Sequence, residues 1–254
     1  MIQLGSPIYR FDSVLSTMDE LDRLARNGAP EGAAVIAAVQ EQGRGRAGRA
    51  WVTVPGSAFL CSVLLRPDLV AREISSLPLI AGLAIAEAIE LIGGVACKLK
   101  WPNDILVNEK KICGVLMQSR SVGERVEFAN LGFGVNLNST IVEIPPTATS
   151  LQIETGLQID FATFEQAVFS RLSARYAEFL EAGGKPSLQG WVDRALFLGE
   201  SVEIGQPQGV LRGRFIGVSP DGALRLETEL GVKDVAIGEL TRGPRAAYGM
   251  STPK

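Results

Sequence analysis

Residues 33–65 read AAVIAAVQEQGRGRAGRAWVTVPGSAFLCSVLL, two apolar segments joined by a loop rich in glycine and arginine. The apolar segments, residues 33–40 and 58–65, are short and bounded by glycine and proline, which predicts two strands. The loop carries arginines at positions 44, 46 and 49 among small residues, so guanidinium and backbone N–H groups can converge on one anion. We expect a loop that holds phosphate or a mixed anhydride; the alternative is a solvated Arg-Gly loop of the kind that binds RNA.

Helices and further strands are expected on both sides of this stretch. A serine or threonine followed by acids at 16–20 predicts a helix start, and Asn27-Gly28 predicts its end. Other helices are expected at 79–92, 161–180 and 188–195, and strands at 98–100, 105–107, 112–117 and 126–137, joined by hairpins. Beyond Leu198, strands at 202–204, 210–218, 223–227 and 232–237 with Gly and Pro-Asp-Gly turns predict a small closed β-module. We therefore expect an α/β (α+β) chain with domains at 1–196 and 197–254.

The composition excludes several classes of chemistry. The 254 residues carry a net charge of -3, which argues against a surface built to hold nucleic acid. Histidine is absent, which removes imidazole bases, Ser-His and Cys-His pairs and most zinc sites, so no resident metal is expected. Cys61, Cys97 and Cys113 form no C-x-x-C pair and are expected to be reduced core residues. With neither a signal peptide nor a membrane-spanning run, we expect a cytoplasmic protein that does not bind membranes.

Three further segments carry residues suited to chemistry. Residues 100–104, Lys-Trp-Pro-Asn-Asp, place a cation, an amide and a carboxylate between two strands, although a turn alone would explain the last three. Lys111 lies on a strand three residues before Gly114, where it can hold a carboxylate or phosphate; its neighbour Lys110 is better explained by solubility. Residues 132–136, Gly-Phe-Gly-Val-Asn, leave one strand face bare for a ligand.

Four segments in this order, Gln40 with 43–51, 100–104, 111–114 and 132–136, resemble the biotin protein ligases, or biotin--[acetyl-CoA-carboxylase] ligases. The resemblance implies a biotin/lipoate ligase-like catalytic domain with a mixed, largely antiparallel sheet, helices on one face, and a small C-terminal SH3-like β-barrel. Because the signatures begin at about Ser16, it implies the monofunctional type without an N-terminal DNA-binding domain.

The resemblance also implies the site. The biotin-binding residues would be Ser16, Thr17, Met18, Gln40, Gly43, Arg44, Gly45, Arg46, Lys111 and Gly114. The residues binding ATP and the adenylate would be Arg44, Arg46, Arg49, Trp51, Asn103, Lys111, Gly134 and Asn136. The catalytic residues would be Lys111, Arg46 and Asp104, with Asp104 receiving or orienting the acceptor amine. Met18 stands where the family often has asparagine, and Asp12-Ser13 offers a second register for that segment.

The implied reaction joins biotin and ATP, with Mg²⁺, to biotinyl-5'-AMP and then transfers biotin to a lysine of a biotin carboxyl carrier protein or carrier domain. Without a histidine, positioning and charge compensation would replace proton transfer. One rival is a lipoate or octanoate ligase of the same superfamily; another is a nucleic-acid-binding protein that uses the Arg-Gly loop and the β-module. No DNA partner is expected, and the sequence leaves open a monomer or a homodimer joined at sheet edges.

Overall fold

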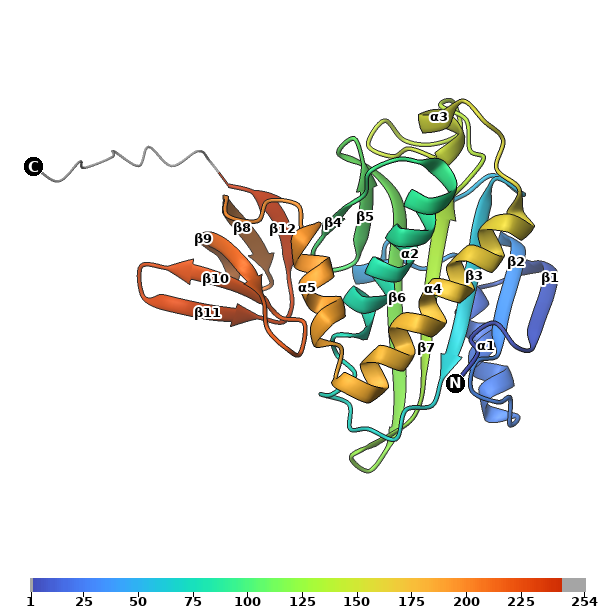
Figure 1. Ribbon diagram of the computed structural model, residues 1–254, viewed down its shortest axis with the longest axis horizontal. Coiled ribbons are helices and arrows are strands. Elements are labelled where there is room, and N and C mark those ends of the chain that lie inside the picture. The colour runs from blue at the N-terminus through green and yellow to red at the C-terminus, as the bar shows by residue number, and fades with distance from the viewer. Residues whose placement is uncertain (1, 244–254) are drawn as a thin grey trace, which may run out of the picture.

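The computed structural model describes residues 2–243, which form two β-sheets with helices packed around the larger one (Figure 1). The larger sheet has seven strands in the order β1-β2-β3-β7-β6-β5-β4. β1 and β2 run parallel, and every other neighbouring pair is antiparallel, so the prediction of a mixed, largely antiparallel sheet is confirmed. In chain order the strands are β1 (Ile8–Val14), β2 (Ala34–Gln40), β3 (Ala58–Leu65), β4 (Lys98–Lys100), β5 (Asp104–Val107), β6 (Lys110–Val122) and β7 (Arg125–Asn136).

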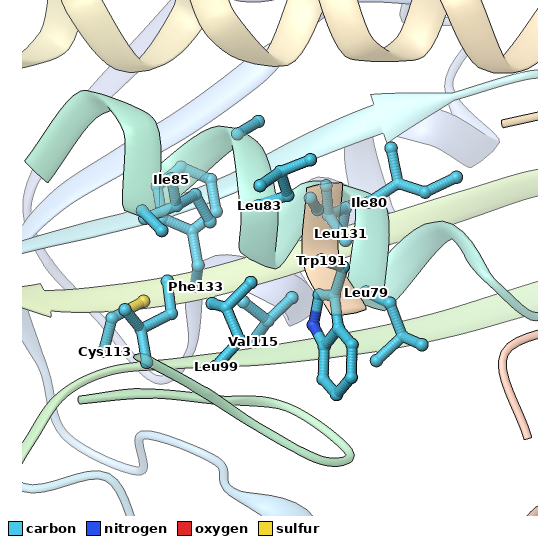
Figure 2. Packing of buried hydrophobic residues seen from close by; sticks show 14 of the residues in the cluster. Leu79, Ile80, Leu83, Ile85, Leu99, Cys113, Val115, Leu131, Phe133 and Trp191 are labelled. Carbon is cyan, nitrogen blue, oxygen red and sulfur yellow. The ribbon is translucent and has the colours of Figure 1, made fainter. Parts of the chain in front are cut away.

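One face of this sheet is covered by α2 (Leu77–Gly93) and α4 (Phe161–Ala182). α2 is apolar around most of its circumference, and Figure 2 shows its Leu79, Leu83 and Ile85 over Val115 and Phe133 of the strands. Pro78 lies in its first turn, where the missing N–H is tolerated, and Gly94 ends it in the left-handed conformation with φ 62°. The main hydrophobic core therefore lies between α2, α4 and the sheet.

The opposite face carries α1 (Thr17–Arg26), so the expectation of helices on one face only was wrong. Leu21 and Ala25 of α1 pack with Val35, Leu64 and Phe128, whereas the alternating neighbours of these strand residues belong to the main core. α1 is strongly amphipathic and is too short to cover the face, which leaves the sheet open beside its N-terminus. That opening is where the candidate site lies.

The C-terminal strands form a second, five-stranded antiparallel sheet in the order β11-β10-β9-β8-β12. Its strands are β8 (Ser201–Gln206), β9 (Gly209–Val218), β10 (Leu224–Thr228), β11 (Gly231–Val235) and β12 (Glu239–Arg242). Within the described residues β11 and β12 are its two edges and do not pair, so the strands do not close into the expected barrel. The last eleven residues of the expected 197–254 domain, 244–254, lie outside the described residues.

Most predicted α-helices and strands are confirmed, and three α-helices or strands of the described residues were missed. α1, α2, α4 and β2 to β11 match the expected segments within a few residues, except that β6 continues past the expected end at 117 to Val122. The helix expected at 188–195 lies slightly earlier, as α5 (Lys185–Asp193). The missed elements are β1, β12 and the short α3 (Leu151–Thr155). The three cysteines are buried and free, as expected. Among the described residues, no helix is long and apolar enough to cross a membrane.

Candidate functional site

The floor of the site is a bare patch of sheet made by glycines of β6 and β7. Gly114 lies opposite Gly134 in the β6–β7 register, and Gly132 lies opposite Leu116. These residues share the sheet face that α1 leaves open. A Cβ built on Gly134 would lie 2.6 Å from the indole of Trp51, so the indole rests directly on the backbone there. Any larger residue at position 134 would close this space.

The roof of the site is the loop at 43–51, which folds into a narrow hairpin. Its main chain is held by bonds from Gly45 N to Arg49 O at 2.7 Å and from Trp51 N to Gly43 O at 2.9 Å. A Cβ on Gly43 would lie 2.3 Å from the carbonyl oxygen of Trp51, which explains glycine at this position. The indole Nε1 of Trp51 is buried without a hydrogen-bond partner among the described residues.

The three loop arginines take three different directions. Arg44 pairs with Asp19 of α1 at 2.5 Å, and Arg49 pairs with Glu239 of β12 at 2.9 Å. Arg46 is half-buried, and its Nη1 lies 3.5 Å from Asn103 Oδ1, over the cavity. The loop is thus tied to α1 on one side and to the C-terminal sheet on the other, and Arg46 is the arginine directed inward.

One end of the site is cationic. Lys111 Nζ pairs with Asp104 Oδ1 at 2.6 Å and lies 5.5 Å from the centre of the Trp51 ring. Loss of solvent lowers the pKa of the Arg46 guanidinium, and the nearby Asp104 carboxylate opposes this shift. Because the ordinary pKa of arginine lies far above neutrality, Arg46 stays charged. Two cations and one carboxylate therefore face the same end, which favours an anionic ligand there.

The other end is neutral and polar. Ser16 caps α1, and Thr17 donates from its backbone N and its Oγ1 to Gln40 Oε1 at 2.8 and 2.9 Å. Thr17 Oγ1 also lies 2.8 Å from Ser62 Oγ. The Met18 side chain lies against Gly132, its Cγ 2.8 Å from a Cβ built there. Hydroxyl and amide groups at this end can bind a ligand that both donates and accepts hydrogen bonds.

The competing register at Asp12-Ser13 falls on the exposed part of β1, where Ser13 Oγ donates to Glu41. Neither residue lines the cavity described below.

A cavity of about 140 Å³ lies between floor and roof. It brings together most of the residues singled out from the sequence: Ser16, Thr17, Met18, Gln40, Arg44, Gly45, Arg46, Arg49, Trp51, Asn103, Asp104, Lys111, Gly114 and Gly134. Gly43 and Asn136 do not line it; Asn136 is buried, and its Nδ2 donates to Thr149 O at 3.0 Å. The prediction omitted Ala50, Val115, Leu116, Gly132 and Phe133, which also line it. The resemblance placed Gly114 and Gly134 in the site, and strand alternation from these two glycines would also have found Leu116 and Gly132.

Comparisons with known proteins identify the family of this chain. The family profile "Biotin/lipoate A/B protein ligase family" matches residues 11–136, and "Biotin protein ligase C terminal domain" matches residues 197–240. The chain is 34% identical to biotin--[acetyl-CoA-carboxylase] ligase of Paracoccus denitrificans, over 82% of this chain and 90% of that protein. It is 33% identical to the bifunctional ligase/repressor BirA of Bacillus subtilis, over 94% of this chain and 75% of that protein.

Among solved structures, a similar one is the biotin protein ligase of Aquifex aeolicus in complex with biotin and ATP. Its TM-score is 0.78 at 32% identity, covering 93% of this chain and 98% of that one. The likeness therefore spans both sheets.

Proposed function

Because the chain belongs to the biotin protein ligase family, we propose that it joins biotin to ATP as biotinyl-5'-AMP and transfers the biotinyl group to a lysine of a carboxylase carrier domain. The observation that carries the proposal is the cavity with a neutral polar end at Thr17 and Gln40 and a cationic end at Arg46 and Lys111. A ureido ring donates and accepts hydrogen bonds, and a carboxylate lies at the far end of its chain, so biotin matches both ends.

In the first step, a biotin carboxylate oxygen attacks the α-phosphorus of ATP and pyrophosphate leaves. Two anionic groups must approach each other, so the step needs fixed positive charge rather than a proton acceptor. Lys111 and Arg46 supply that charge at the same end of the cavity. Lys111 lies on β6 and is positioned by the sheet, whereas Arg46 lies in the loop at 43–51.

Mg²⁺ would bind together with ATP, as the MgATP complex. This ion usually keeps several waters and binds through substrate phosphates and one or two carboxylates. Among the described residues, no group of three or more Cys, Asp or Glu side chains is arranged to hold a metal ion. Asp104 is the carboxylate that lines the cavity, so phosphate oxygens and water would supply most of the ligands.

In the second step, a neutral lysine amine attacks the acyl carbon of the adenylate. The new C–N bond forms, the C–O bond to the phosphate breaks, and AMP leaves with the electron pair. The amine releases one proton, for which Asp104, one-quarter exposed, is the nearby acceptor. AMP is a good leaving group, so the enzyme's main task is to position the amine.

The C-terminal sheet belongs to this proposal as a second domain beginning at residue 197. A separate family profile starts at 197, and Phe197 has a left-handed φ of 68° where the chain leaves the α5 region. Arg49 of the loop reaches Glu239 of this sheet, so the second domain helps to hold the roof of the site.

The decisive test is pyrophosphate exchange with purified protein, ATP and Mg²⁺, comparing biotin with lipoate. We expect exchange with biotin because the dithiolane ring of lipoate offers nothing to bond with Thr17 and Gln40. Exchange with lipoate alone would replace the biotin assignment with the lipoate ligase alternative. Binding of RNA without any exchange would favour the nucleic-acid alternative.

A further inference from the structure

A second cavity, of about 230 Å³, adjoins the candidate site at the edge of β6. It shares Arg46, Asn103, Val115 and Leu116 with the first cavity, so the two spaces meet at the cationic end. β5 pairs with β6 only as far as Gly114, and from there the edge of β6 is free of β5. The second cavity occupies this free edge.

Asn103 lies between the two cavities and lines both of them. Asn103 takes the place of the missing strand: its backbone O accepts from Val115 N at 2.9 Å, and its Nδ2 donates to Val115 O at 2.8 Å. Arg46 Nη1 lies 3.5 Å from Asn103 Oδ1, and both residues line both cavities. Asp104 follows Asn103 directly and lines the first cavity. A group that reached Asn103 along the second cavity would thus arrive beside the proposed reacting atoms.

The walls of the second cavity are mainly apolar and come from both parts of the molecule. The apolar residues lining it are Pro78, Leu79, Trp101, Pro102, Val115, Leu116, Met117, Ala223 and Ala236. At this cavity two hydrogen bonds join the catalytic part to the C-terminal part, from Trp101 Nε1 to Gly222 O at 3.1 Å and from Ser75 Oγ to Asp221 O at 2.8 Å. Among the described residues that line it, Arg46 is the single cation and Asp221 the single acid. Asp221 accepts a hydrogen bond from Ser219 Oγ.

We propose that this second cavity is the channel through which the carrier's lysine side chain reaches the adenylate, an inference that rests on the proposed function. A lysine has an unbranched four-carbon stem that can lie along apolar walls with its amine beyond them. A nucleotide triphosphate carries several negative charges, and walls with one arginine do not match it. The apolar lining thus favours the lysine stem over the phosphates.

The inner end of the channel also suits the chemistry of the amine. A lysine attacks only as the neutral amine, and its ordinary pKa of about 10.4 keeps it protonated at neutral pH. Apolar surroundings and a neighbouring cation both lower the pKa of a lysine. Arg46 at the end of an apolar channel supplies both conditions. Asp104, which follows Asn103 in the chain, has a carboxylate that can receive the proton.

The test is to narrow the channel and measure the two half-reactions separately. Ala236→Trp and Met117→Trp place indoles at an exposed and a half-buried wall position; Ile237→Trp and Gln118→Trp are matched controls at adjacent exposed positions that do not line the channel. We expect biotin-dependent pyrophosphate exchange within about twofold of wild type in all four proteins. Transfer from preformed adenylate to a carrier domain should fall at least about tenfold in the two channel variants only, a loss of about 1.4 kcal/mol.

A small nucleophile provides the second measurement. Hydroxylamine should trap the enzyme-bound adenylate at the wild-type rate in the channel variants, because it is much smaller than a lysine side chain and can pass a narrowed channel. Unchanged transfer to the carrier in both channel variants would overturn the proposal, and so would a parallel fall in pyrophosphate exchange, which would assign the cavity to the nucleotide. Wild-type protein without biotin-dependent exchange would overturn the proposed function itself, and the inference with it.

Discussion

The floor and the roof of the site are built in opposite ways. The floor glycines lie on β6 and β7, interior strands whose backbone is hydrogen-bonded on both sides around Gly132 and Gly134. The roof, residues 43–51, is largely exposed and is tied down by two surface ion pairs, Arg44–Asp19 and Arg49–Glu239. Sheet register therefore fixes the shape of the site, whereas the roof contributes charge on a weakly held segment.

The largest effect should come from removing the positive charge of Lys111, which lies on β6 beside the floor glycines. Lys111→Ala should lower the rate of biotin-dependent pyrophosphate exchange by about 10²–10³-fold, the range found when a preorganised electrostatic group is removed. The Asp104 carboxylate would also lose its 2.6 Å partner. The exposed neighbour Lys110 is the matched control, and Lys110→Ala should change the exchange rate by less than about twofold.

Removing the inward charge of the roof should have a smaller effect. Arg46→Ala should lower exchange by about 10–10²-fold, because the roof is held by few contacts and can shift to bring neighbouring arginines closer in partial compensation. Arg46→Lys should recover part of the rate, since it restores the charge without the planar guanidinium. If Arg46→Ala were as severe as Lys111→Ala, the roof would be as preorganised as the floor and the contrast between them would fail.

A methyl group added to the floor tests shape without changing charge. In Gly134→Ala the new Cβ would lie 2.6 Å from Trp51, so the indole must lift from the sheet. Because Gly134 and Trp51 belong to the expected nucleotide-binding residues, we expect the Kd for ATP to rise about tenfold, which corresponds to about 1.4 kcal/mol. The thermal midpoint should change little, because the indole lies on the open face and not in the main core. Calorimetric titration with ATP measures the Kd, and an unchanged value would show that the nucleotide does not use this part of the floor.

The same contrast explains what the sequence could predict. The floor was partly predictable because strand alternation is local: the spacing of Gly132 and Gly134 on one strand indicates a bare face, whereas Gly114 lies alone on β6 and was placed in the site by the resemblance. The missed strand β1 is a parallel edge strand whose polar residues Arg10, Asp12 and Ser13 interrupt the apolar pattern. The five-residue α3 is too short to show helical periodicity.

The contacts of the roof could not be predicted, because they join distant positions. Arg49 and Glu239 are separated by 190 residues, and nothing local indicates that they meet. Three arginines in one loop suggested three anion ligands, yet two of them pair with carboxylates of α1 and β12. Asn136 was expected at the ligand, but its amide donates to Thr149 O, a bond set by the path of the chain after β7.

The smallest expected effect concerns the two ion pairs of the roof. Exposed pairs contribute about 0.2–1 kcal/mol each, so Asp19→Asn or Glu239→Gln should raise the KM for ATP by less than about fivefold. Asp22→Asn is the matched control for Asp19, since it breaks an exposed pair with Arg26 on the same helix without touching the loop. The thermal midpoint should fall by no more than about 4 °C in all three variants, because 1 kcal/mol shifts it by about 2–4 °C in a protein of this size.

Salt and trypsin distinguish this loss of roof contacts from a general weakening of the fold. At about 1 M salt, where screening acts within about 3 Å, wild type and variants should converge in KM because the pairs are already screened in the wild type. At low salt, trypsin should cleave the arginine-rich loop faster in Asp19→Asn than in Asp22→Asn, because Arg44 no longer has its partner. Equal cleavage rates in these two variants would mean that the backbone bonds at Gly45 and Trp51 hold the roof without help from the ion pairs.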